Sequence, residues 1–125
     1  MGRVYHEIQE NGRQLWTLFD TGARNSYIIR PAAASLPLQR LAQPMQVAIG
    51  GQVRTFEEGC VLNAYIEGKF VNVLAYVIDQ LGRDDRGRPV EVLFGALAMQ
   101  QWSIYPVPHE ERLDLSHYTG EFTEY

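Results

Sequence analysis

The stretch LFDTGARNS, residues 18–26, places one carboxylate, Asp20, directly after an apolar run and before Thr21 and Gly22. Asp, Thr and Gly are common turn residues, so an ordinary hairpin corner would explain them. A carboxylate held at the end of a buried strand could instead act as a general acid or base. Whether Asp20 serves a turn or a reaction depends on the elements around it.

Short apolar segments separated by turn residues make up most of the chain. Asn11-Gly12 and Gly50-Gly51 each predict a hairpin, because such pairs favour tight β-turns. Strands are expected at residues 3–9, 13–19, 26–29, 45–49, 52–57, 61–67, 69–78, 90–94 and 112–118. Many short strands with one convincing helix, at residues 95–102, indicate an all-β barrel.

Smaller features complete this expectation. Pro31 can open a single helical turn, whereas Pro106 and Pro108 are expected to break the chain. The stretches LWTLFDTGARNSYI and VEVLFGALAMQQWSI share an apolar strand that ends in Leu-Phe, which predicts two similar structural units.

The composition is that of one acidic domain. Its 125 residues suffice for one core, and the net charge of −4 argues against nucleic acid or an anionic membrane as partner. No apolar run is long enough to span a membrane, and the N-terminus lacks a signal-peptide pattern, so a cytoplasmic location is expected. Cys60, Trp16 and Trp102 are interpreted as core residues.

No metal or cofactor site is expected. The mixed-sign run at residues 83–88 is interpreted as a solvated loop, not as a set of cation ligands. No glycine-rich phosphate loop occurs, since neither Lys-Ser nor Lys-Thr follows Gly50-Gly51. The histidines lie far apart and share no ligand spacing: His6, His109 and His117.

Residues 18–23, followed by Ser26-Tyr27-Ile28, resemble the active-site segment of retropepsin-like aspartic proteases. In that family two apolar residues precede Asp-Thr-Gly, Ala or Ser follows it, and a Ser or Thr comes shortly after. Leu93-Phe94-Gly95 resembles the second signature of the family, which is two apolar residues and a glycine before a short helix. The stretch at 49–53 occupies the place of the flap hairpin of the family. The resemblance covers roughly residues 3 to 105.

The resemblance implies a closed β-barrel that acts as a homodimer and cleaves an extended peptide or protein substrate. It implies catalytic roles for Asp20, Thr21 and Gly22, with the Thr21 hydroxyl locking onto the backbone of the partner. It implies substrate contacts from Ala23, Arg24, Asn25, Ile49, Gly50, Gly51, Gln52 and Val53. Leu93, Phe94 and Gly95 would support the catalytic loop, and no cofactor is involved.

Two positions depart from the family pattern, and one segment lies outside the resemblance. Arg24 stands where viral members carry an acidic residue that binds the substrate backbone, and Ala96 replaces the Asp or Arg of many relatives. Residues 1–105 are expected to form the protease domain. Residues 106–125 form a tail that could add a strand to the dimer interface, dock on its own subunit or recruit another protein.

The chemistry requires more than one carboxylate. One carboxylate takes a proton from water while a second, protonated, donates to the scissile carbonyl oxygen, and such a pair shares one proton. The chain has a single Asp-Thr-Gly, and Asp79, although it follows an apolar strand, precedes Gln80-Leu81 instead of Thr-Gly. The sequence therefore predicts a homodimeric aspartic endopeptidase with one Asp20 from each subunit.

Two alternatives stay open. The first is a catalytically silent dimer of the same fold that binds an extended peptide or a protein partner. The second is an unrelated all-β domain in which Asp-Thr-Gly is an ordinary turn.

Overall fold

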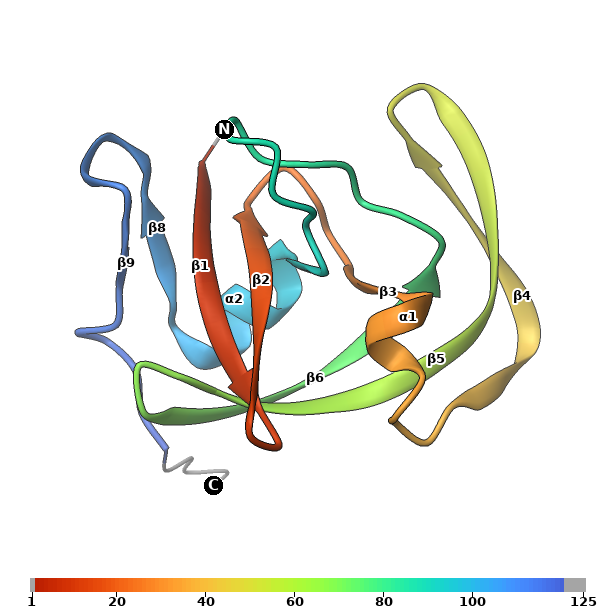
Figure 1. Ribbon diagram of the computed structural model, residues 1–125, viewed down its shortest axis with the longest axis horizontal. Coiled ribbons are helices and arrows are strands. Elements are labelled where there is room, and N and C mark those ends of the chain that lie inside the picture. Colours follow the sequence, from red (N-terminus) through yellow and green to blue (C-terminus); the bar gives the residue numbers. More distant parts are fainter. Residues whose placement is uncertain (1, 121–125) are drawn as a thin grey trace.

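The computed structural model describes residues 2–120, which consist mostly of β-strands (Figure 1). The strands are β1 (Arg3–Glu10), β2 (Arg13–Asp20), β3 (Ser26–Ile29), β4 (Gln39–Ile49), β5 (Gln52–Ile66), β6 (Lys69–Ile78), β7 (Val92–Phe94), β8 (Tyr105–Val107) and β9 (Arg112–Asp114). The helices are α1 (Arg30–Ala33) and α2 (Ala96–Trp102), with a 3-10 turn at Pro108–Glu110. In residues 2–120 no helix has the length and hydropathy to cross a membrane.

The first seven strands form one sheet in the order β1-β2-β7-β3-β6-β5-β4, and β8 pairs with β9. Strand β7 lies between β2 and β3, parallel to the first and antiparallel to the second. Leu18 is opposite Leu93 and Phe19 is opposite Phe94, so the two Leu-Phe pairs lie side by side. Strand β1 also pairs with β5 at one position. The β-rich fold is confirmed, and a fully closed barrel stays a prediction.

The main core is made by apolar side chains from β1, β2, β3, β5, β6, β7 and the two helices α1 and α2. The rings of Phe19 and Phe94 are fully buried, and their centroids lie 4.9 Å apart beneath the end of β2. Burial of each such side chain stabilises the fold by about 1.5–3 kcal/mol. Cys60 and Trp102 are buried in the same core, as the sequence predicts.

A second apolar cluster lies under the β4–β5 hairpin. Its buried members, Tyr27, Phe56 and Ile78, come from three different strands. Partly buried side chains of β4 pack against them at alternate positions, which is the period of a strand with one inward face: Met45, Val47 and Ile49. This cluster seats the base of the hairpin on the body of the molecule.

Strand β5 is longer than the sequence predicts. It runs unbroken from Gln52 to Ile66, whereas the prediction had separate strands that end at residue 57 and begin at 61. Gly59, between the two expected strands, lies within the ladder opposite Tyr76. A β-carbon on Gly59 would lie 3.3 Å from the carbonyl oxygen of Ala75, so a glycine allows the close strand pairing here.

The C-terminal strands also differ from the prediction. Pro106 does not break the chain but lies within β8, opposite Leu113, where a two-stranded ribbon tolerates proline. Strand β9 ends at Asp114 instead of residue 118. The Asp114 carboxylate accepts hydrogen bonds from the Ser116 amide and hydroxyl, at 2.9 and 2.6 Å, and this local turn competes with continued strand pairing.

Trp16 is not a core residue, which corrects the prediction. It is partly buried on the outer face of β2, where it stacks on Tyr5 and lies under the guanidinium of Arg88, 4.2 Å from the ring centroid. Its indole N–H donates to Asp84 at 2.9 Å. The Asp84 carboxylate also accepts the backbone amides of Arg86 and Arg88, so the loop at 82–90 has a fixed anchor on β2.

Candidate active site

Strand β2 delivers Asp20 as its last residue, at the start of a tight turn. The Gly22 amide donates to Asp20 Oδ1 at 2.8 Å, and the Ala23 amide donates to the Asp20 carbonyl oxygen at 3.2 Å. Arg3 Nε lies 3.5 Å from Asp20 Oδ2. The Asp20 side chain keeps 13 % of its surface exposed, so one oxygen is fixed by the turn while the carboxylate still reaches solvent.

Thr21 lies on the outside of the same turn. Its amide donates to the Gly2 carbonyl oxygen at 2.9 Å, and its hydroxyl oxygen accepts the Gly2 amide at 2.9 Å. The residue is exposed and does not line the cleft described below. In one chain, therefore, Thr21 ties the turn to the N-terminal end of β1.

The start of α2 supports the Asp20 turn from beneath. The Ala96 amide donates to the Ala23 carbonyl oxygen at 2.7 Å, and the Leu97 amide donates to that of Arg24 at 3.1 Å. The Gly95 amide donates to the buried Ser26 hydroxyl oxygen at 3.0 Å. These three bonds hold the backbone after Asp-Thr-Gly against the turn between β7 and α2.

A cleft of about 750 Å³ opens beside the Asp20 carboxylate. The predicted site residues that line it are Asp20, Gly22, Ala23, Arg24, Asn25, Ile49, Gly50 and Leu93. The predicted site residues outside its lining are Thr21, Gly51, Gln52, Val53, Phe94 and Gly95. The cleft thus joins the Asp20 turn to the inner side of the β4–β5 hairpin.

Several cleft residues were missed in the sequence. They are Arg3, Leu18, Tyr27, Val47, Ala48, Arg54, Ile78, Gln80, Leu81 and Gly82. Alternation along the predicted hairpin strands could have indicated Val47, whereas no local signal marks the segment after β6. Burial raises the pKa of Tyr27, so this side chain is a neutral part of the cleft wall.

The hairpin of β4 and β5 has a turn that only glycine adopts readily. Gly50 and Gly51 have φ values of +57° and +80°, and no atom comes within 4 Å of a β-carbon placed on either. Ile49 pairs with Gln52 below this turn, and Val53 is 70 % exposed. Figure 1 shows the hairpin projecting from the body, with its tip toward the same side of the molecule as the end of β2.

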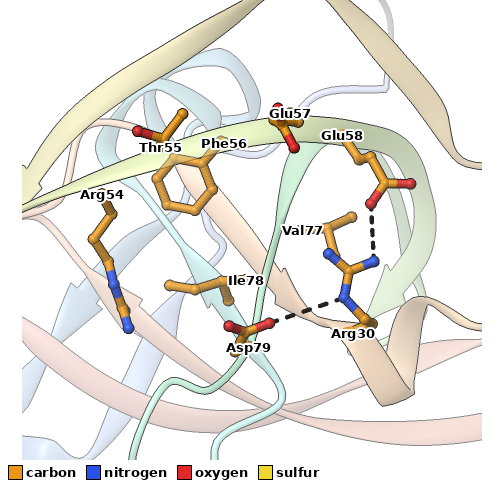
Figure 2. Close-up of a pocket in the computed structure, with 9 residues that line it drawn as sticks. All are labelled: Arg30, Arg54, Thr55, Phe56, Glu57, Glu58, Val77, Ile78 and Asp79. Carbon is orange, nitrogen blue, oxygen red and sulfur yellow. Dashed lines mark hydrogen bonds and ion pairs between the residues drawn. The ribbon is translucent and has the colours of Figure 1, made fainter.

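A smaller pocket of about 150 Å³ lies between β5 and β6. It adjoins the Asp20 cleft and shares Arg54 and Ile78 with it. Figure 2 shows Arg30 between two carboxylates, with Glu58 2.9 Å and Asp79 3.9 Å from its guanidinium nitrogens. The two acids thus share one cation, Arg30. This pocket is an ion-paired surface feature, and the Asp20 cleft is the better candidate for chemistry.

A family model described as aspartyl protease matches residues 6–97, most of the chain, including the Asp20 turn and β7. The chain belongs to this aspartyl protease family. The family resemblance seen in the sequence is thereby confirmed. A comparison with curated proteins gives no significant match.

Solved structures show the same fold as this aspartyl protease family member. The retroviral protease-like domain of Ddi1 from Leishmania major is 14 % identical, with a TM-score of 0.62 over 94 % of this chain and 90 % of that domain. EIAV protease, in complex with the inhibitor HBY-793, is 20 % identical, with a TM-score of 0.54 over 81 % and 88 % of the two chains. The protease of Simian Foamy Virus (mac) is 14 % identical, with a TM-score of 0.53 over 82 % and 99 %.

Proposed function

We propose that this protein is an aspartic endopeptidase whose active unit is a homodimer with two facing Asp20 carboxylates. The observation that carries the proposal is the number of carboxyl groups in the cleft. Among residues 2–120, Asp20 is the sole acidic residue that lines it. Hydrolysis by water held between two carboxyl groups needs one more, and a second copy of the chain would supply it across a two-fold axis.

The chain's own groups suit this reaction. One Asp20 would take a proton from water as the water oxygen attacks the scissile carbonyl carbon, and the other would donate its proton to the carbonyl oxygen. Collapse of the tetrahedral intermediate would release the amine with a proton returned from the pair. The Gly22 amide, bonded to Oδ1, would keep each carboxylate aimed while the proton moves.

The β4–β5 hairpin is proposed to act as a lid. An extended peptide in the cleft needs backbone partners on both sides and exclusion of water. Ile49 and Gly50 line the cleft near the hairpin tip, and the exposed Gly50-Gly51 turn makes few contacts that would hold it in place. Opening would admit the substrate and closing would cover it.

The proposed dimer contact is the edge of the molecule that carries Thr21. Thr21 is exposed there, and a β-carbon on the neighbouring Gly2 would lie 3.3 Å from Pro106 Cγ of β8. The N-terminal end of β1, the catalytic turn and the β8–β9 ribbon therefore lie at one edge. A partner that docks on this edge would bring the two turns together.

A peptide-library digest tests the proposal. Asp20→Asn keeps the shape of the side chain but removes the ionisable carboxyl group. Circular dichroism first shows that wild type and the variant are both folded. Each protein is then incubated with a proteome-derived peptide library. We expect cleavage by wild type alone. Equal cleavage by both proteins would contradict the mechanism, and cleavage by neither would favour the silent peptide-binding dimer.

A further inference from the structure

The cleft carries positive charge on a protein that is acidic overall. The whole chain has a net charge of −4. The charged residues that line the cleft are three arginines and one aspartate: Arg3, Arg24, Arg54 and Asp20. Because guanidinium groups stay protonated at any working pH, this charge is permanent.

Two of the three arginines have no carboxylate of their own. Arg3 is paired with Asp20 at 3.5 Å, whereas Arg24 and Arg54 form no ion pair with any group in residues 2–120. Most other arginines do pair with a neighbouring acid: Arg13 with Glu10, Arg30 with Glu58, Arg40 with Glu57, Arg88 with Glu7 and Arg112 with Glu110. Lys69, Arg83 and Arg86 also form no ion pair within residues 2–120, but they lie outside the cleft lining, so Arg24 and Arg54 are the unpaired cations that a bound peptide would meet.

The two arginines lie on opposite sides of the cleft. Arg24 follows the catalytic turn directly, and Arg54 is on β5 in the hairpin, opposite Val47 of β4. Figure 2 shows Arg54 at the rim of the smaller pocket, where Glu58 and Asp79 contact Arg30 instead. A peptide that runs through the cleft would therefore pass one guanidinium on the floor and one on the hairpin.

We infer that the cleft selects extended peptides with acidic side chains on residues that flank the scissile bond, and that Arg24 and Arg54 determine this specificity. The cleavage part of this inference rests on the proposed function, whereas the part that concerns peptide binding does not. Closing the hairpin would remove water from both guanidiniums, which is costly unless a carboxylate replaces it. A Glu or Asp side chain offers two oxygens in the geometry that a guanidinium binds best.

The same charges would exclude other peptides. A Lys or Arg side chain beside Arg24 or Arg54 would place like charges together under the hairpin. The cleft would therefore disfavour basic peptides in addition to binding acidic ones. The acidic side chain should not be next to the reacting carbonyl itself, because Asp20 already supplies negative charge there. The expected preference is therefore for acid on either side of an uncharged cleavage pair.

The test is a set of matched fluorogenic peptides that differ only by Glu or Gln at one flanking position at a time. The readout is the ratio of kcat/KM for the Glu peptide to that for the Gln peptide. Since both peptides meet the same preparation, the ratio does not depend on how much of the protein is dimeric. We expect Glu to be favoured at two or more positions, by about two- to five-fold for each exposed ion pair formed.

Arg24→Gln and Arg54→Gln should each bring the ratio toward one at a different position of the peptide. Arg86→Gln is the matched control, because Arg86 is exposed and does not line the cleft, so the substitution removes the same charge elsewhere on the surface. For wild type, added salt should lower the ratio, which tests the inference without any substitution. A ratio near one at every position, or equal loss in all three variants, would overturn it.

A binding measurement separates this inference from the proposed function. Fluorescein-labelled Glu and Gln peptides are titrated with Asp20→Asn, and the fluorescence anisotropy is followed. Tighter binding of the Glu peptide that is lost in Asp20→Asn/Arg24→Gln or Asp20→Asn/Arg54→Gln supports charge selection even if no peptide is cleaved. Cleavage that depends on Asp20 but shows equal affinity and equal kcat/KM for the two peptides would refute charge selection and leave the protease intact.

Discussion

Gly95 lies directly against the backbone of Asn25. A β-carbon on Gly95 would overlap the Asn25 carbonyl oxygen and lie 2.7 Å from its carbonyl carbon. The carbonyl oxygen of Arg24 would be 2.9 Å away. These are backbone atoms of the loop that follows Asp20, so they cannot move aside as a flexible side chain would. The glycine thus allows α2 to begin in contact with the loop that follows Asp20.

Gly95→Ala should destabilise the protein by about 1–3 kcal/mol or more, because the added methyl group forces the turn and the helix apart. The loss is measured as the change in free energy of unfolding by urea denaturation. Gly120→Ala is the control, since the nearest atom to its β-carbon, Tyr118 Oη, is 3.6 Å away. Equal stability of the two variants would show that the close contact at Gly95 does not affect the free energy of unfolding.

Gly51→Val should impair turnover far more than folding. Valine at a φ of +80° costs roughly 1–2 kcal/mol, and a strained, stiff tip should lower kcat/KM by about tenfold if the hairpin is a lid. Gly68→Val is the matched control, because Gly68 has a φ of +81° and equally open surroundings in the β5–β6 turn. If both variants lose stability alike but keep wild-type kinetics, the hairpin is not a lid.

Local turn chemistry explains how much of the fold the sequence could predict. Asn11-Gly12 and Gly50-Gly51 carry positive φ values that mark a tight turn, and both predicted hairpins are present. Gly68, which lies between the strands expected at 61–67 and 69–78, also has a positive φ and joins β5 to β6. Gly59 differs from these glycines, because it lies within a continuous strand and serves close strand pairing instead of a turn. A single sequence does not distinguish these two uses of glycine.

The cleft depends on contacts that no local pattern encodes. The Asp20 turn was identified from its own residues, but Gln80 and Leu81 join the cleft only because β6 ends beside β3. The sequence predicts Trp16 as a core residue. Its outer face is instead covered by Arg88, whose loop is distant in the sequence. The sequence alone therefore gives no sign of the cleft residues that the non-local topology contributes, Gln80 and Leu81 among them.

Asp84→Asn should loosen the loop that leads from the cleft to β7. The variant should differ from wild type only at pH values at which the Asp84 carboxylate of wild type is ionised. The backbone amide of Arg88, followed by the contacts of Arg86 and Trp16, holds the pKa of Asp84 below its usual value. A lowered pKa means that ionised Asp84 stabilises the fold above about pH 4, and that this contribution is lost as the pH falls through the folded-state pKa.

The measurement is the melting temperature of wild type and Asp84→Asn from pH 7 to pH 3. We expect the variant to melt at a lower temperature at pH 7 and the difference to shrink below about pH 4. Asp85→Asn is the control, because Asp85 is an exposed neighbour in the same loop. A difference that stays constant with pH would mean that the ionised carboxylate is not what anchors the loop.

The most direct test of the shared pair of carboxylates is a subunit-mixing experiment. The wild-type concentration is kept fixed, above the value at which its specific activity becomes constant. Asp20→Asn is added in increasing amounts, and cleavage is measured after the subunits have exchanged. If each site needs one Asp20 from each copy, wild-type activity falls to about one half at equal concentrations and to about one tenth at tenfold excess, since mixed dimers are inactive. Activity that stays unchanged at every ratio would show that each chain acts alone and would contradict the shared site.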